Sequence, residues 1–327
     1  MVLRRGNKIK EIQMTVKFNR SNILVVGDLI LDEYIWGIAN RISPEAPVPV
    51  VLVEKENYVL GGAANVANNL VDLDANVMAA GMVGNDDNSK VLKRMLDRAG
   101  IETYGVIPDP GRVTSIKTRI MAGTQHIVRI DRELTHQINP TYEDSLVNYL
   151  DHVRNDVDAV IISDYNKGVV TDSLVKSITK IFAGKFIAVD PTGHDYSRYK
   201  GATIVTPNLK EAEYASNMFL KDDASFERAA ERLTKHIDNV LITRGKDGMV
   251  LFEKNKSPLY IPTKAKEVYD VSGAGDTVIA VLTLAVTSGF TLPGAAKVAN
   301  IAAGVVVSKI GTETVSIEEI NKSLKRD

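Results

Sequence analysis

A glycine-rich segment near the end of the chain carries the strongest signal for chemistry. Residues 270–276 read DVSGAGD and lead directly into a predicted helix. The first backbone N–H groups of a helix have no intrahelical partner, and the helix dipole adds partial positive charge there. Since glycines leave such groups accessible, Gly273, Ala274 and Gly275 are candidates for holding a phosphate, with Asp276 as general base for a hydroxyl. The alternative is a tight turn in which Asp276 only caps the helix.

A second pair of glycines precedes another predicted helix. Residues 61–69 read GGAANVANN. Gly61 and Gly62 allow the backbone to approach a ligand closely. The amide of Asn65 can donate to and accept from hydroxyl groups. The alternative is simple helix capping with an asparagine-rich face.

Two carboxylates follow the first predicted strand. Asp28 and Asp32 are four residues apart, so they face one ligand if the segment curls, and paired carboxylates suit sugar hydroxyls. The strand is not followed by GxGxxG, which argues against a nicotinamide-dependent dehydrogenase, and the chain contains no GxxxxGK[ST] phosphate loop.

Short apolar runs alternate with helical patterns along most of the chain. A continuous apolar run is typical of a strand buried on both faces of a parallel sheet. Strands that alternate with helices predict an α/β fold, a doubly wound and mostly parallel central sheet flanked by helices. Strands are expected at residues 23–26, 76–80, 159–163, 186–189, 203–206 and 240–243, and helices at 89–99, 173–182, 225–236, 274–288 and 292–308.

Two segments break this alternation and predict a small β-sheet lid. Residues 48–53 follow a proline-rich stretch, and residues 113–121 and 126–130 alternate polar with apolar side chains around a turn at 122–124. The expected organisation is an N-terminal extension over 1–20 and one domain over 21–327, with a lid contributed by about 32–60 and 103–135.

Composition excludes several classes of protein. Hydrophobic residues make up 44% of the 327 and charged residues 25%, which predicts a large folded core. The formal net charge of −1 gives nucleic-acid binding no electrostatic support. Cysteine is absent and the five histidines lack metal-site spacing, which argues against zinc. The first 20 residues are basic and polar, and the apolar stretch near 278–286 is too short for a bilayer, so a cytoplasmic protein without membrane contact is expected.

The two glycine-rich segments, in this order, resemble the two signatures of the ribokinase-like, or PfkB-type, carbohydrate kinases. The similarity runs from about residue 22 to the C-terminus, and Val278 stands where the family usually has Phe. The resemblance implies a ribokinase-like fold with ATP and Mg²⁺ as cofactors. It also implies that Asp276 is the catalytic base and that the amides of Gly273, Ala274 and Gly275 form the anion hole for the transferred phosphoryl group.

The same resemblance implies a nucleotide site. Asn208 and Glu211 match the family's NxxE element, which acts on the magnesium shell and the ATP phosphates. An amide and a carboxylate suit a hydrated Mg²⁺, which prefers oxygen ligands. The wall around the adenine nucleotide is implied at Thr243, Arg244, Gly245 and Asn300. A monovalent cation such as K⁺, found in some relatives, is implied at Asp270 and the backbone around Ser272 and Gly311.

Four further stretches, at 27–51, 117–133, 163–168 and 190–193, resemble the kinase module of the heptose-7-phosphate kinases. This similarity implies phosphoryl transfer from ATP to the anomeric C1 hydroxyl of D-glycero-D-manno-heptose 7-phosphate, in ADP-heptose synthesis for lipopolysaccharide. The implied sugar-binding residues are Asp28, Asp32, Gly61, Gly62, Asn65 and Asp164. Candidate cations for the sugar's phosphate are Lys117, Arg119, Arg129 and Lys167; Lys167 is favoured because it follows a strand end, and the alternative for the others is solvated strand residues.

Other functions stay open at this point. One is a PfkB-type kinase of another sugar or sugar phosphate, and another is a non-catalytic sugar-binding regulator, which has no need of Asp276. A homodimer through the lid is expected, since open β-layers leave edges that proteins usually cover. No HxGH-type nucleotide motif accompanies the kinase segments, so a separate nucleotidyltransferase is expected to act later in the pathway.

Overall fold

The computed structural model describes residues 15–123, 125–263, 271–309, 311 and 313–325. Its strands are β1 (Asn22–Gly27), β2 (Leu29–Ile42), β3 (Pro49–Gly62), β4 (Asn76–Gly84), β5 (Glu102–Asp109), β6 (Ser115–Ala122), β7 (Gln125–Arg132), β8 (Ala159–Ser163), β9 (Phe186–Asp190), β10 (Ile204–Val205), β11 (Asn239–Thr243), β12 (Met249–Glu253) and β13 (Leu259–Ile261). Its helices are α1 (Ala63–Asp72), α2 (Asp87–Arg98), α3 (Pro140–Val153), α4 (Asp172–Ile181), α5 (Leu209–Ser216), α6 (Asp223–Leu233), α7 (Ala274–Thr287), α8 (Leu292–Val306) and α9 (Ile317–Leu324), with short 3-10 turns at Tyr196–Tyr199 and Gly245–Asp247.

The large sheet has the strand order β13-β12-β11-β10-β9-β8-β1-β4-β5. All its pairings are parallel from β11 to β5, and β12 adds antiparallel pairs at the other edge. All six strands expected from apolar runs belong to this sheet. The predicted doubly wound, mostly parallel sheet is therefore confirmed.

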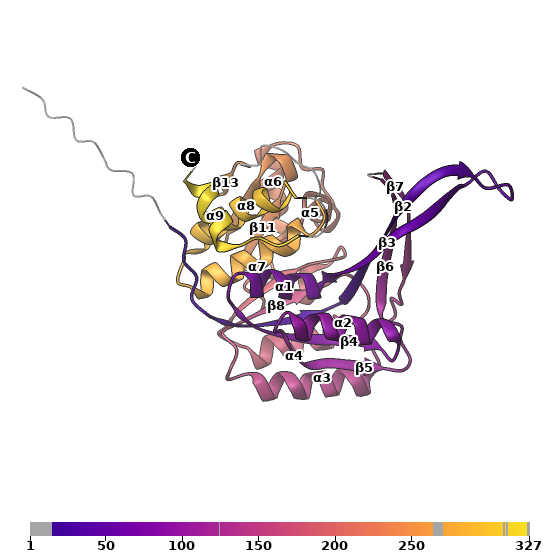
Figure 1. Ribbon diagram of the computed structural model, residues 1–327. Helices are drawn as coiled ribbons and strands as arrows, with labels where there is room; N and C mark the ends of the chain where they lie inside the picture. The colour runs from indigo at the N-terminus through magenta and orange to yellow at the C-terminus, as the bar shows by residue number, and fades with distance from the viewer. Residues whose placement is uncertain (1–14, 124, 264–270, 310, 312, 326–327) are drawn as a thin grey trace, which may run out of the picture.

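Helices cover both faces of the large sheet, as the side chains of β1 show. Ile23 and Val25 are fully buried in a core layer shared with α1, α2, α7, α8 and α9. Leu24 and Val26 are fully buried in a second layer, shared with α3, α4, α5 and α6. Burying one such side chain stabilises the fold by about 1.5–3 kcal/mol. Successive strand residues point to opposite faces of the sheet. The unbroken apolar run at 23–26 therefore indicates that both faces of β1 are buried. Figure 1 shows α3 and α4 on one side of the strands and α1 and α7 on the other.

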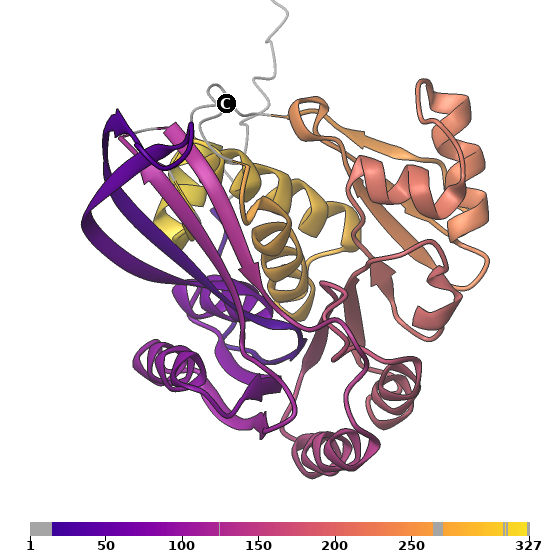
Figure 2. The same ribbon diagram turned by 90° about the vertical axis from the view of Figure 1, so that its right-hand side faces the viewer.

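A separate four-stranded sheet forms the lid, in the order β3-β2-β6-β7. β2 pairs antiparallel with β3 and parallel with β6, and β7 closes the hairpin with β6. Figure 1 shows β2 and β3 as a long ribbon that extends beyond the body, and Figure 2 shows the lid strands beside one another and apart from the large sheet. The expected lid over residues 32–60 corresponds to β2, β3 and the connection between them.

The second lid segment is shorter at its start than the sequence indicated. Residues 103–109 belong to β5, which pairs in parallel with β4 at the edge of the large sheet. The prediction that the lid begins at 103 is wrong for these residues. β5 carries both polar and apolar residues and is only partly buried, because it is an edge strand of the sheet; a lid strand has the same mixed character. None of the helices in the described ranges combines the length and apolar character needed to cross a membrane.

Candidate active site

Asp276 lies in the first turn of α7, at the carboxyl edge of the large sheet. The helix begins after Gly273, whose φ of 76° is in the left-handed region that favours glycine. The Asp276 side chain is only 3% exposed. Its Oδ2 accepts a hydrogen bond from Asn65 Nδ2 at 2.7 Å, and its Oδ1 accepts one from the Tyr165 hydroxyl at 2.7 Å. A buried carboxylate is thus held on both oxygens by neutral donors.

Burial raises the pKa of Asp276 to about 6, since it disfavours the charged form. The hydrogen bonds from Asn65 and Tyr165 act in the opposite direction. Of the nearby charges, Asp32 raises this pKa and Lys117 lowers it. The carboxylate is therefore ionised at neutral pH but more basic than an exposed aspartate, which suits a group that accepts a proton from a hydroxyl.

The position of Asn65 depends on close packing between α1 and α7. Gly62 caps α1 with a φ of 54°, and a Cβ there would lie 2.6 Å from the carbonyl oxygen of Asp28. Thr277 Oγ1 donates to Asn69 Oδ1 at 2.8 Å, and Asn69 Nδ2 donates to the carbonyl of Asn65 at 2.9 Å. These buried bonds fix the two helix starts against each other, so the two glycine-rich segments meet in the structure.

A cavity of ≈ 300 Å³ lies beside the start of α7. Its wall includes Asp164, Asp190, Asn208, Thr243 and Gly275, which come from the carboxyl ends of several parallel strands and the start of α7. Ligands of open α/β sheets bind at this edge. A Cβ at Gly275 would meet no atom within 4 Å, so the predicted anion hole opens onto free space.

Some of the residues predicted to bind the nucleotide line the cavity, and others make structural contacts outside its wall. Asn208 and Glu211 line the cavity while they form a capping box at the start of α5, each side chain accepting the other's backbone N–H at 3.0 and 2.8 Å. The Arg244 guanidinium lies 4.8 Å from the ring centre of Phe226. Gly245 begins the short 3-10 turn with a φ of 57°. Asn300 Nδ2 donates to the carbonyl of Pro262 at 2.8 Å, so its amide is engaged in holding the chain after β13.

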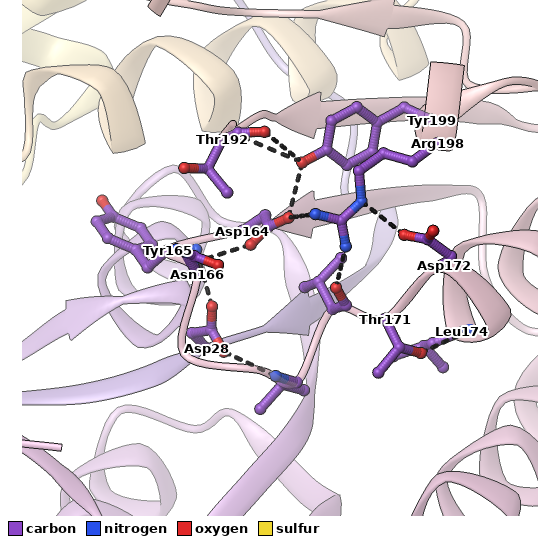
Figure 3. A network of polar contacts seen from close by, with 12 residues as sticks. Asp28, Asp164, Tyr165, Asn166, Thr171, Asp172, Leu174, Thr192, Arg198 and Tyr199 are labelled. Carbon is purple, nitrogen blue, oxygen red and sulfur yellow. Dashed lines mark hydrogen bonds and ion pairs between the residues drawn. The ribbon is translucent and has the colours of Figure 1, made fainter. Parts of the chain in front are cut away.

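Asp28 has a different task from the predicted sugar contact. Its carboxylate accepts the backbone N–H groups of Tyr165, Lys167 and Val169 at 2.8, 3.0 and 3.2 Å. Figure 3 shows this aspartate beneath the loop that follows β8. Residues 29–42 are an extended strand, so the segment does not curl to bring Asp28 and Asp32 onto one ligand. Burial raises the pKa of Asp28 to about 6.

Asp164 belongs to a buried network behind the same loop. Its carboxylate accepts the Tyr199 hydroxyl at 2.7 Å and the Asn166 N–H at 2.9 Å, and Arg198 lies 3.3 Å away. Figure 3 shows these groups converging on Asp164, with Arg198 also reaching toward Asp172. Asp164 thus anchors the loop after β8 while it lines the cavity, and its contact with the sugar stays a prediction.

The lid brings cations toward Asp276. Arg119 Nη1 lies 2.6 Å from Asp32 Oδ1; a Cβ at Gly61 would lie 2.5 Å from this aspartate's Oδ2, so a larger residue there would displace the Asp32 side chain. The Lys117 ammonium lies 5.4 Å from the ring centre of Tyr165, and burial lowers the pKa of this lysine.

The other two predicted cations have carboxylate partners. Lys167 Nζ lies 2.6 Å from Glu133, and Arg129 lies 2.8 Å from Asp131. In the described part of the chain, Lys117 is the cation of this group that no carboxylate contacts as an ion pair. The structure therefore favours Lys117 as the cation available to an anion, whereas the sequence favoured Lys167.

Tyr165 is a site residue that sequence reasoning missed. Its hydroxyl contacts the candidate base, and its side chain lines the cavity. The sequence predicts contacts with the substrate for its neighbours Asp164 and Lys167 but assigns no role to Tyr165 itself. The available signal was its place directly after the strand end at Ser163 and Asp164, the edge at which polar side chains gather.

Comparison with known proteins identifies the family. A family model described as pfkB family carbohydrate kinase matches residues 20–320, nearly the whole chain. The chain belongs to the pfkB family of carbohydrate kinases. Its enzyme class is therefore that of a phosphotransferase.

Curated pfkB relatives include two proteins named bifunctional protein HldE. That of Geobacter sulfurreducens is 49% identical over 308 residues, covering 93% of this chain and 63% of the relative. That of Geobacter metallireducens is 48% identical over 307 residues, with the same coverages. The chain thus spans less than two thirds of the length of these relatives.

Solved structures confirm the ribokinase-like fold of this pfkB chain. Ribokinase of Arabidopsis thaliana, complexed with ribose and ATP, superposes with a TM-score of 0.74 at 20% identity, covering 94% of this chain and 99% of that one. Phosphofructokinase-2 of Escherichia coli, in complex with potassium, gives 0.76 at 17% identity, with coverages of 94% and 98%. At such identities the likeness establishes the fold alone.

Kinases of the pfkB family use ATP with a divalent metal, and the cavity fits that requirement. Its side-chain donors are oxygens, with Glu211 and Asn208 beside the carboxylate of Asp190. Burial raises the pKa of Asp190 well above its usual range, and Asp276 and Glu211 add to this; a bound cation would offset the accumulated negative charge. No cluster of three or more ligating side chains closes around one point in the described ranges. The oxygen atoms of Asp190, Asn208 and Glu211 are of the kind that Mg²⁺ prefers as ligands.

The implied monovalent-cation site is only partly within the described residues. Asp270 lies outside them. Ser272 and Gly311 are described, and Gly311 has a φ of 84°.

Proposed function

We propose that this chain transfers a phosphoryl group from ATP to the anomeric C1 hydroxyl of D-glycero-D-manno-heptose 7-phosphate, forming the 1,7-bisphosphate. The observation that carries the proposal is Asp276, a buried carboxylate held between Asn65 and Tyr165, at a helix start beside a cavity lined by carboxylates and an amide. The identity of about half the residues with proteins named HldE supports the choice of substrate.

The chemistry follows from the positions of these groups. Asp276 accepts the proton of the C1 hydroxyl as the sugar oxygen attacks the γ-phosphorus of ATP, and the bond to the β-phosphate oxygen breaks to release ADP. The N–H groups of Gly273, Ala274 and Gly275 donate to the oxygens of the transferred group, where negative charge gathers. Asn208 and Glu211 would hold the water shell of Mg²⁺, which supplies charge neutralisation when bound. Thr243, Arg244 and Gly245 would contact the nucleotide.

The sugar would lie between the lid and α1. Asn65 and Asp32 would contact its hydroxyls, and Lys117 would bind its phosphate. Lys167 and Arg119 would be further phosphate-binding cations, each leaving its present carboxylate partner to contact the phosphate. Desolvation makes such a charged contact stronger than it is in water. We further propose that K⁺ binds near Ser272 and Gly311, and that the enzyme works in the cytoplasm, where a nucleotidyltransferase uses its product.

Substrate selectivity tests this function. In a coupled assay with ATP and Mg²⁺, heptose 7-phosphate is expected to give the highest kcat/KM in a panel with heptose, fructose 6-phosphate, ribose and fructose. Lys117→Met is expected to raise KM for the sugar phosphate at least about tenfold, the free energy of one charge-assisted contact, and to leave KM for ATP unchanged. Lys90→Met, which alters an exposed lysine paired with Asp87, is the control.

The alternatives give different results in the same assay. A hexose phosphate or ribose that is turned over while heptose 7-phosphate is not would assign the chain to another sugar. A panel without turnover, with sugar binding retained, would indicate a regulator. If Lys117→Met left every KM at the wild-type value, the phosphate contact proposed for this lysine would be wrong.

We also propose a homodimer in which the lids pair. The lid carries several well-exposed apolar side chains: Ile38, Ile42, Leu52, Val53, Val128 and Ile130 are 41–70% exposed. Exposed apolar side chains on an open sheet suit contact with a second copy of the chain, and open strand edges are usually covered. Light scattering at micromolar concentration is expected to give twice the 35.7 kDa chain mass, and Leu52→Asp is expected to halve it. A wild-type monomer would refute the dimer.

A further inference from the structure

We propose that Tyr165 is the positioning residue of the reaction, which aims the Asp276 carboxylate at the acceptor hydroxyl. The Tyr165 hydroxyl donates to Asp276 Oδ1 at 2.7 Å, and Asn65 donates to the other oxygen, Oδ2, at 2.7 Å. Two donors from different elements fix the plane of the carboxylate. Each oxygen keeps a lone pair for the substrate. The inference rests on the proposed function, since it takes Asp276 to be the base.

The main chain of Tyr165 is itself anchored. Its N–H donates to Asp28 Oδ2 at 2.8 Å, and the N–H groups of Lys167 and Val169 bind the same carboxylate. Gly168 supports this geometry, because its φ is 85° and a Cβ there would lie 2.0 Å from the carbonyl oxygen of His136. Figure 3 shows Tyr165 at the start of this loop, with Asp28 below it. The loop is thus fixed by a buried carboxylate. Because the backbone of Tyr165 is held in place, its hydroxyl is also held in place against Asp276.

The ring of Tyr165 also connects the base to the lid. The Lys117 ammonium lies 5.4 Å from the ring centre, within the range of a cation–π contact. Lys117 is on β6 of the lid, and Asp276 is on α7, which packs against the large sheet. The Tyr165 side chain therefore contacts both the lid and the helix that carries the base. An anion that binds Lys117 therefore lies next to the residue that orients the base.

Several charged groups face Asp276 besides these donors. They are Asp32 from β2, Lys117 from β6 and Asp190 from β9. Asp32 disfavours the ionised base, and Lys117 favours it. The Tyr165 hydroxyl stabilises the ionised form more than the neutral form, because a donated hydrogen bond is stronger to a carboxylate. Its removal should therefore make the base hold its proton to higher pH.

Tyr165→Phe tests this role, because it removes the hydroxyl and keeps the ring that Lys117 contacts. Tyr196→Phe is the matched control: the hydroxyl of this 4% exposed tyrosine is buried and has no hydrogen-bond partner among the described residues. The acid limb of the kcat/KM profile, which reports the free enzyme, is expected to move upward by about one pH unit in Tyr165→Phe and to stay in place in Tyr196→Phe. The loss of kcat/KM should then grow about fivefold between pH 8 and pH 6.

A second measurement separates this inference from the proposed function. The Asp276 carboxyl is titrated directly by ¹³C NMR of aspartate-labelled protein, assigned with Asp276→Asn. An upward pKa shift in Tyr165→Phe alone supports the positioning role, even if heptose 7-phosphate proves not to be the substrate. An acid limb and a carboxyl pKa that both coincide with those of the wild type would overturn it, whatever sugar the enzyme uses.

Discussion

Asp276→Asn is expected to abolish measurable turnover, with kcat lower by a factor of about 10²–10⁴, the usual contribution of a positioned general base. The amide has nearly the same shape, but it cannot take up the proton of the hydroxyl. Its oxygen can accept from either Asn65 or Tyr165, which now each donate to one carboxylate oxygen. Steady-state kinetics measure the loss, and calorimetric titration with ATP and Mg²⁺ is expected to give a Kd within about threefold of the wild type.

The fold of this variant should be intact, because the substitution removes a buried charge whose pKa is already raised by burial. A thermal midpoint at or above that of the wild type would show this. If Asp276→Asn kept wild-type kcat at neutral pH, Asp276 would not be the base, and the structural basis for calling this helix start a catalytic site would be lost.

Gly275→Val is expected to lower kcat/KM for ATP by about 10²–10³, the effect of keeping the charged transition state away from the N–H donors at this helix start. A side chain at Gly275 would point into the cavity, since nothing lies within 4 Å of its Cβ position. It would therefore occupy the place of the phosphoryl group. The protein itself should tolerate the change, because the backbone of residue 275 lies in the first turn of α7 without a positive φ.

Gly294→Ala is the matched control for this variant. Gly294 also lies in the first turn of a helix, α8, and its nearest neighbour would be Thr291 Oγ1 at 3.3 Å. This variant is expected to keep wild-type kinetics. Wild-type kcat/KM in Gly275→Val would mean that the transferred phosphoryl group does not approach the start of α7.

Much of this fold follows from sequence because its strands are buried on both faces. The run at 23–26 predicts a central parallel strand, and β1 occupies that place between β4 and β8. Edge and lid strands share a mixed polar and apolar pattern, so the sequence places residues 103–109 in the lid although they belong to β5, which pairs with β4. Pairing partners are a tertiary property that periodicity does not contain.

The candidate site was predictable where a backbone requirement accompanied the side chain. Gly62 and Gly273 have positive φ values at two helix starts, and the glycines of both segments were visible in the sequence. Asp28 and Tyr165 were different. In sequence, an aspartate that binds three backbone N–H groups cannot be distinguished from one that contacts a sugar. The position of Tyr165 after a strand likewise does not predict its contact with Asp276, which is far away in the sequence.

The central claim is that phosphate from ATP is placed on the anomeric oxygen of heptose 7-phosphate. The most direct test is ³¹P NMR of a reaction containing ATP, Mg²⁺, D-glycero-D-manno-heptose 7-phosphate and enzyme, with Asp276→Asn in parallel. We expect a second sugar phosphate signal, coupled to the anomeric proton, to grow in step with ADP for the wild type and to be absent for the variant. A new phosphate on any other carbon, or ADP formed without a new sugar phosphate, would contradict the account.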